Sequence, residues 1–512
     1  MDRTISEEDF CSLIGRRIHD LVSLSVYISK DKRPVLCFTR PLVGRLLLAA
    51  TNAEELLDVY RAKQNQRWFP LRQLVAPIKL FANVSYILQH VLNFMPTYRL
   101  LSIDQDFEAA TTEAFNYTCS VLKSTVRALI RKARSLGIPV PEKAPAHARF
   151  SEVLAKGHLP YDRPSEKVAS PEETVVYLAT AFLNLAEESK FLHVIRDSPV
   201  DNYADWIPDP ISEERLRDLE EKFHNLQSLY DTHISDSNVE SLDENLPILR
   251  GHISVIYHLL ETATAFTHYY ERHIPDFSRQ SGKRQVKIMN PVALMDVLMN
   301  YSLAFSSRYI LRTRSLCHEM LHRYAIQGRI AVRVPRYRGF HVRPSTLIAK
   351  IVTHYGSRVE MNLEGETYNA GVTLDLFQAN EKLIARKRRL IAEEVHSLSS
   401  CQGRAEKQDA HACIRRAIQS LFEQNKLVLY ERNLHLDGLQ PLDGETKAEF
   451  TIRALNQLLA MGKIDVEMET PVSFSGDRRV LDDIKLLAET GYGEDDFGNN
   501  LPLPEKLAYL RK

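Results

Sequence analysis

Apolar residues recur every three to four positions through most of the first 326 residues, and this spacing predicts amphipathic helices. The last predicted helix has the clearest start. Asn290 can cap it, and Pro291 fits the first helical position, where a backbone N–H is not needed. The segment 137–171 is rich in proline and charge, and is a candidate boundary between sub-domains. We therefore expect residues 1–326 to form an all-α region, with helices at 10–26, 42–60, 71–92, 107–136, 174–194, 214–230, 246–270 and 292–324.

The pattern changes at Gly328. From there, short segments alternate between aliphatic and polar side chains, which is typical of strands, and two segments with helical spacing interrupt them. Glu364 and Gly365 supply a turn between two of the strands. The predicted order is β-α-β-β-α, an α+β arrangement in which helices back antiparallel strands. Its segments lie at 329–335, 344–353, 358–363, 366–370 and from 374 toward 396.

One segment carries the candidate chemistry. Residues 339–346 read Gly-Phe-His-Val-Arg-Pro-Ser-Thr and lie between a predicted strand and a predicted helix. This segment resembles the active-site signature of HPr, the histidine phosphocarrier of the phosphoenolpyruvate-dependent sugar phosphotransferase system. The signature runs Gly, aliphatic, His, small, Arg, Pro, small, small, and Phe340 alone departs from it. The resemblance extends without a gap over residues 328–380.

The resemblance implies an open-faced sandwich, in which helices back one face of an antiparallel sheet. It also implies a phosphocarrier rather than an enzyme with its own small-molecule substrate. His341 would accept a phosphoryl group from an Enzyme I-like donor and pass it to a downstream acceptor protein, in transport or in regulation. No metal or other cofactor is implied. Val372 occupies the position at which many HPr proteins carry a regulatory serine, so we expect no control by a serine kinase there.

The residues around His341 suit this chemistry. A neutral imidazole is a competent nucleophile near pH 7. We expect the amides of Ser345 and Thr346, at the start of the following helix, to bind phosphate together with the guanidinium of Arg343. Gly339 has no side chain and would let the loop approach the helix end. The His341 side chain should stay exposed for transfer.

The fourth strand expected from the resemblance does not directly follow the second helix. A strand candidate appears only at 463–472, followed by a helix at 476–487. We therefore expect a discontinuous phosphocarrier domain over 328–490, with a helical insertion at about 390–460 and a C-terminal tail at 491–512. A separate C-terminal domain is the alternative.

A second motif points to different chemistry. Residues 318–322 read His-Glu-Met-Leu-His, which matches the helical zinc motif of metalloproteases and would place His318 and His322 on one face beside Glu319. Arg323 follows directly, and no Glu or His stands at a familiar spacing for a third ligand. The metalloprotease is therefore a remote alternative.

Two further alternatives concern the helical region. It could be an interaction scaffold that uses a non-transferring HPr-like module for binding. His252, His258 and His268 fall in one predicted helix. We expect structural roles for these histidines, with a second phosphoacceptor as the alternative.

Charge and composition narrow the partners. Lys plus Arg and Asp plus Glu both number 66, so the net charge of zero gives no support to nucleic-acid binding. The arginines that crowd the sequence around His341 should instead form a positive rim that steers an acidic partner protein. These are Arg329, Arg333, Arg336, Arg338 and Arg343.

The chain begins with acidic residues rather than a secretory signal, and we expect no membrane span. The six cysteines are scattered and predict neither a disulfide framework nor a Cys-rich zinc site. The prediction is a cytoplasmic protein. Nothing in these patterns indicates an oligomeric state. The cysteines are Cys11, Cys37, Cys119, Cys317, Cys401 and Cys413.

Overall fold

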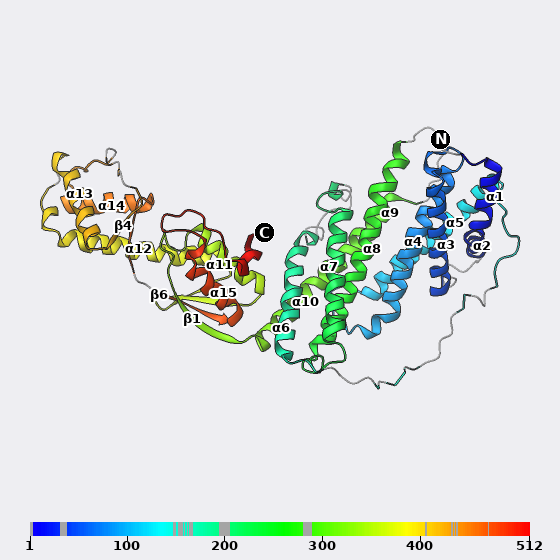
Figure 1. Cartoon of the computed structure of the whole chain (residues 1–512), viewed down its shortest axis with the longest axis horizontal. Helices are drawn as coiled ribbons and strands as arrows, with labels where there is room; N and C mark the ends of the chain where they lie inside the picture. Colours follow the sequence, from blue (N-terminus) through cyan, green and yellow to red (C-terminus); the bar gives the residue numbers. More distant parts are fainter. Residues whose placement is uncertain are drawn as a thin grey trace. The chain divides into compact units, whose positions relative to one another are not determined.

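The computed structural model divides the chain into two compact units, Met1–Met320 and Leu321–Lys512 (Figure 1). Helices dominate both units, and the strands form small antiparallel sheets. The chain is therefore a mostly helical, multidomain protein. The structure describes residues 4–511 except 31–37, 147–149, 152–156, 158, 161, 163–166, 194–204, 280–288, 405–406, 432–433, 435, 437–438 and 469–470.

The first unit is built from helices. Its α-helices are α1 (Glu7–Arg17), α2 (His19–Lys30), α3 (Arg40–Val59), α4 (Phe69–Phe94), α5 (Phe107–Ser135), α6 (Pro171–Glu188), α7 (Glu213–His233), α8 (Asn245–Arg279), α9 (Pro291–Asp296) and, as far as Met320, α10 (Ala304–Tyr324). Ser6, Thr39, Asp106 and Ser212 each cap a helix by accepting a hydrogen bond from the amide three residues later. Helix α4 packs against α3, α5 and α8, and α7 packs against α8 (Figure 1).

The predicted helix boundaries are partly right. Asn290 caps α9 by accepting the Val292 amide at 3.1 Å, as predicted. The single helix predicted at 10–26 is wrong, because the chain leaves helical geometry at Ile18, between α1 and α2. The helix predicted at 292–324 contains a π-helical turn, Val297–Leu303. Apolar residues continue at helical spacing through both the break at Ile18 and the π-helical turn, so the sequence pattern could not reveal either feature. The segment 137–171 lies partly outside the described residues.

One stretch, Phe69–Thr97, is long and apolar enough to cross a membrane by length and composition alone. We expected no such run. Within the first unit, 67% of its most apolar window is buried. A helix that contacts neighbours on several sides needs apolar residues around most of its circumference, which accounts for this composition.

The second unit contains a four-stranded antiparallel sheet in the order β1-β6-β2-β3. Residues of one face point inward, among them Val332, Met361 and Phe474, and form a core with the adjacent helices. The opposite face carries polar side chains such as Arg329, whose guanidinium donates to Ser473 at 2.9 Å. The elements are β1 (Gln327–Arg333), α11 (Val342–Tyr355), β2 (Val359–Leu363), β3 (Glu366–Asn369), α12 (Thr373–Ser397), β6 (Pro471–Asp477) and α15 (Arg478–Glu489).

Helix α12 connects two cores. Its first half contributes Leu376 and Leu383 to the core under the sheet, whereas Ile391 and Val395 belong to a second core. The second core is formed by the end of α12 together with the segment between α12 and β6, into which α12 leads directly (Figure 1). We call this segment the insertion, and it extends beyond the predicted boundary at about 460 to include β5. The segment contains α13 (Lys407–Glu423), β4 (Leu427–Leu429), α14 (Lys447–Ala460) and β5 (Ile464–Val466).

The single strand predicted at 463–472 is wrong. Ile464–Val466 pairs with β4 in a separate two-stranded sheet, and the strand that completes the large sheet is Pro471–Asp477. An aliphatic, alternating sequence looks the same in either sheet, so spacing alone could not separate the two strands.

The expectation of a C-terminal tail at 491–512 is also wrong for its described residues. Tyr492, Leu507 and Leu510 are buried in the core under the sheet. The Tyr492 hydroxyl donates to the Arg333 carbonyl at 2.6 Å, which joins this segment to the end of β1. Residues after α15 are thus an integral part of the second unit.

His252 is a structural core residue, in line with the expectation. Its side chain is fully buried, and its Nε2 accepts the Leu101 amide at 2.9 Å. The Thr313 hydroxyl, which donates to the Tyr309 carbonyl, lies 2.7 Å from Nδ1 and can accept the Nδ1 proton. Burial lowers the pKa of His252 to about 4, because a charged imidazole would lose its hydration. His258 and His268 lie 3.2 and 2.9 Å from Glu261 and Glu213.

We predict that His252 makes the stability of the first unit depend on pH. A pKa near 4 in the folded state and near 6.5 in the unfolded state means that stability is fully present above pH 6.5 and falls as the pH is lowered toward 4. His252→Gln should destabilise the unit at pH 7, and the gap to the unmodified protein should shrink by roughly 2 kcal/mol at pH 5. Urea unfolding followed by tryptophan fluorescence tests this, since Trp68 and Trp206 both lie in this unit. An equal gap at both pH values would contradict the prediction.

Candidate functional site

His341 lies at the junction between a loop and a helix. It is the N-cap residue of α11, with an extended backbone, and its carbonyl accepts the Ser345 amide at 3.2 Å. The loop before it connects β1 to α11, so the sheet and the helix together determine where the imidazole lies. The side chain is 23% exposed. The expectation of a freely exposed imidazole is therefore only partly met.

Asn380 of α12 holds the loop in place. Its side-chain oxygen accepts the Phe340 amide at 2.9 Å, and its nitrogen donates to the Arg338 carbonyl at 3.2 Å. Gly339, which lies between Arg338 and Phe340, has a φ of +64°, and a Cβ at this position would lie 2.3 Å from the Asn380 side-chain oxygen. Glycine is therefore required both by the backbone conformation and by the close approach of Asn380. Phe340 is fully buried in the core, which gives this position an anchoring role.

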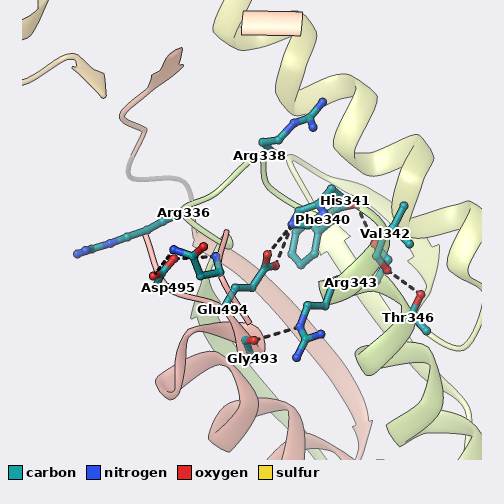
Figure 2. Close-up of polar contacts among 12 residues, drawn as sticks. Arg336, Arg338, Phe340, His341, Val342, Arg343, Thr346, Gly493, Glu494 and Asp495 are labelled. Carbon is teal, nitrogen blue, oxygen red and sulfur yellow. Dashed lines mark hydrogen bonds and ion pairs between the residues drawn. The ribbon is translucent and has the colours of Figure 1, made fainter. Parts of the chain in front are cut away.

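A carboxylate from the C-terminal segment contacts the imidazole. Glu494 lies with its two oxygens 2.8 and 3.1 Å from Nε2 of His341, as Figure 2 shows. The Glu494 side chain is only 4% exposed. An ionised carboxylate can only accept, so a neutral His341 must carry its proton on Nε2 and leave the lone pair on Nδ1. We did not predict Glu494, because its segment was expected to be a tail.

Backbone contacts fix the position of Glu494. Its amide donates to the Gly491 carbonyl at 3.2 Å, and the Leu501 amide donates to the Gly493 carbonyl at 2.9 Å. Gly493 has a φ of +76° and approaches the side chains of Leu347 and Arg343. The segment after α15 is thus folded back against the start of α11.

Arg343 contacts this same segment. Its Nε donates to the Gly493 carbonyl at 3.0 Å, and Figure 2 shows the guanidinium directed toward Gly493. One N–H of the guanidinium is therefore engaged within the protein. The positive charge of Arg343 remains in the first turn of α11, two residues after His341.

The predicted amide donors need correction. The helix begins at Val342 rather than at Pro344, so the Ser345 amide is already bonded to the His341 carbonyl and is not free. The Ser345 hydroxyl, which is buried, donates to the Phe340 carbonyl at 2.8 Å, and the Thr346 hydroxyl donates to the Val342 carbonyl at 2.6 Å. The amides that precede the first intrahelical bond belong to Val342 and Arg343, because proline has no N–H.

The insertion also touches this loop. Asp465 of β5 accepts the Arg338 amide at 3.3 Å and pairs with Lys387 of α12 at 2.6 Å. Both side chains of this pair are buried. Tyr430 directly follows β4, and its hydroxyl donates to the Arg336 carbonyl at 3.3 Å. The loop that carries His341 is therefore supported by the insertion as well as by α12.

The surroundings of His341 are not uniformly positive, as the arginine cluster had suggested. The exposed Arg336 guanidinium pairs with Asp496 at 3.0 Å, and Arg338 donates to the Ala460 carbonyl at 3.4 Å. The Tyr337 ring and the imidazole make an edge-to-face contact, with the ring centroids 5.6 Å apart. Acidic residues from the C-terminal segment thus offset part of the arginine charge.

The other candidates gain no support. His318, Glu319 and His322 are exposed on α10, and the described residues contain no group of three or more His, Cys, Asp or Glu side chains that could hold a metal ion. Val372 precedes α12 and makes no side-chain capping bond.

We predict that Gly339→Ala will loosen the loop that carries His341. The new Cβ displaces Asn380, which releases the Phe340 amide. Gly365→Ala is a matched control, because Gly365 also has a positive φ but no atom lies within 4 Å of the added Cβ. Its cost should be limited to about 1–2 kcal/mol of backbone strain. Hydrogen exchange read by mass spectrometry should show faster exchange around 334–350 for Gly339→Ala only. Equal protection of this loop in both variants would refute the steric argument.

Comparisons with known proteins add no assignment. No family model, no curated protein and no solved structure matches this chain. What the site can do is therefore inferred from its own residues.

Proposed function

We propose that the second unit is an HPr-like phosphocarrier module in which His341 accepts a phosphoryl group and passes it on. The donor would be an Enzyme I-like phosphotransferase, the acceptor a downstream protein, and the setting cytoplasmic. The observation that carries the proposal is the imidazole at the start of α11, with Nε2 on a buried carboxylate and Nδ1 left as the nucleophile. The element order β1-α11-β2-β3-α12-β6-α15, with an antiparallel sheet, supports an HPr-like sandwich.

The transfer step follows from this geometry. The Nδ1 lone pair of His341 attacks phosphorus, the N–P bond forms, and the bond from phosphorus to the donor breaks with its electron pair leaving on the donor. The ring then carries a proton on Nε2 and phosphorus on Nδ1, and is positively charged. The Glu494 carboxylate stabilises this charge as it develops. The positive end of α11 and the charge of Arg343 favour the phosphoryl oxygens.

The same ring charge makes the transfer reversible. A phosphorylated imidazole that keeps its proton on Nε2 is cationic, and it is a better leaving group than the neutral ring that has lost this proton. Glu494 holds that proton on Nε2, so it favours the form from which phosphorus departs. The pair of His341 and Glu494 therefore suits a carrier, which must give up its phosphoryl group as readily as it accepts it.

An interaction scaffold with a non-transferring module is the second candidate. This candidate is favoured because the side chains of His341 and Arg343 are already hydrogen-bonded within the protein. His341 Nε2 contacts the Glu494 carboxylate, and Arg343 donates to the Gly493 carbonyl. The two candidates differ in whether His341 can be phosphorylated at all.

We predict that the full chain, incubated with labelled phosphoenolpyruvate and Enzyme I, acquires an acid-labile label at His341. His341→Ala should abolish the label, whereas His322→Ala, which removes an exposed histidine of α10, should leave it unchanged. Mass spectrometry under neutral conditions locates the modified residue. If the folded protein acquires no label, the interaction scaffold is the remaining candidate function. If the His322 variant loses the label, the assignment of the phosphoacceptor to His341 is wrong.

We predict that Glu494→Gln lengthens the lifetime of the phosphorylated protein. A neutral amide holds the Nε2 proton less strongly than a carboxylate does, so the labile form is less populated. The half-life should rise by roughly tenfold, the effect of about 1.4 kcal/mol. Asp496→Asn is the matched control, because it removes a neighbouring charge that contacts Arg336 instead. Decay measured by loss of label at pH 7 tests this, and equal lifetimes in the two variants would contradict the role of Glu494.

A further inference from the structure

Two cysteine side chains meet in the core of the insertion. The sulfur atoms of Cys401 and Cys413 are 2.7 Å apart, although the residues are 12 positions apart in sequence. This separation is larger than the disulfide bond length of about 2.05 Å, yet the two thiols are in direct contact. Both residues are free cysteines in the structure.

The packing around the pair holds the sulfurs together. Cys401 ends the short helix Ser399–Cys401, and Cys413 lies on α13. The two residues are 2% and 3% exposed and contact the same core. The Cys413 thiol donates to the Ser400 carbonyl at 3.5 Å, and the Thr451 hydroxyl of α14 donates to the Cys413 sulfur at the same distance. Three segments of the insertion thus fix the two thiols against each other.

We propose that Cys401 and Cys413 form a dithiol–disulfide site, a covalent modification site within the insertion. The chemical partner is a low-molecular-weight disulfide such as glutathione disulfide. One thiolate attacks that disulfide, forms a mixed disulfide and releases one glutathione thiolate. The second thiolate then displaces the other glutathione, and the Cys401–Cys413 bond forms. Two protein thiols lose two protons and two electrons, and one glutathione disulfide becomes two glutathione thiols.

The other described cysteines lie apart from this pair. Cys11, Cys119 and Cys317 form no disulfide and lie in the first unit, and Cys37 lies outside the described residues. Cys317 is fully buried, and burial raises the pKa of its thiol above the ordinary range. Burial also raises the pKa of Cys401, to about 11, so oxidation should be slow and should depend on opening of the insertion core.

The site lies in the part of the molecule that supports the His341 loop. The core that holds the two cysteines also contains Ile464 and Val466, which flank Asp465 in β5. A disulfide would restrict the unfolded states of this segment and stabilise it. This stabilisation does not depend on the proposed function, because it is measured in the insertion and needs no phosphorylation of His341.

The test uses the full chain in glutathione buffers that range from reducing to oxidising. Samples are quenched with acid, unfolded, alkylated and digested, and the peptides are identified by mass spectrometry. We expect a cross-linked peptide that lacks two hydrogens and joins Cys401 to Cys413, together with slower hydrogen exchange in β5 and α14. Cys317→Ser should leave the cross-link intact, and Cys401→Ser should leave Cys413 as a thiol or as its glutathione adduct.

Some outcomes would overturn the proposal. One is full alkylation of both cysteines at every glutathione ratio while circular dichroism reports a folded chain. Another is glutathione adducts without a cross-link, or a cross-link to a different cysteine. The unmodified protein alone decides between these outcomes, so a variant that fails to fold does not affect the result.

Discussion

The fold around the candidate site in the second unit depends on a hydrogen-bond donor for one buried carboxylate. Glu494 is almost completely removed from solvent, and an ionised carboxylate in that position is unfavourable unless donors face it. His341 supplies such a donor, so the segment after α15 must fold back over the start of α11. The same contact orients the imidazole and selects which nitrogen carries the proton. Together with the Arg343–Gly493 hydrogen bond, this interaction couples the segment after α15 to the candidate phosphoacceptor.

The loop that carries His341 is held mainly by side chains rather than by a ladder of strand hydrogen bonds. Asn380 bonds to the loop on both sides of Gly339, and Asp465 accepts the Arg338 amide. These contacts come from α12 and from β5, which lie far apart in sequence. A loop fixed in this way can hold the imidazole in one orientation, as group transfer to a defined atom requires.

Local patterns predicted the elements that depend on local forces. The spacing of apolar residues gave the helices and the β-α-β-β-α order, and Asn290 caps its helix as predicted. Contacts between distant residues were not predictable. Nothing near Glu494 indicates that it meets His341, and alternation alone could not place Ile464–Val466 and Pro471–Asp477 in different sheets. The predicted start of α11 at Pro344 is two residues too late, because proline is accommodated throughout a first turn and so does not identify the first residue of a helix.

The insertion is linked to the candidate site by contacts that cannot be made independently. Asp465 accepts from Lys387 and from the Arg338 amide at once, so its carboxylate is buried only when the insertion, α12 and the loop are all in place. Replacing Asp465 by alanine would leave Lys387 as a buried charge without its partner, which is strongly unfavourable. Any ligand or modification that changes the stability of the insertion must therefore change the stability of the His341 loop. By linkage, whatever binds at His341 must act back on the insertion with the same free energy.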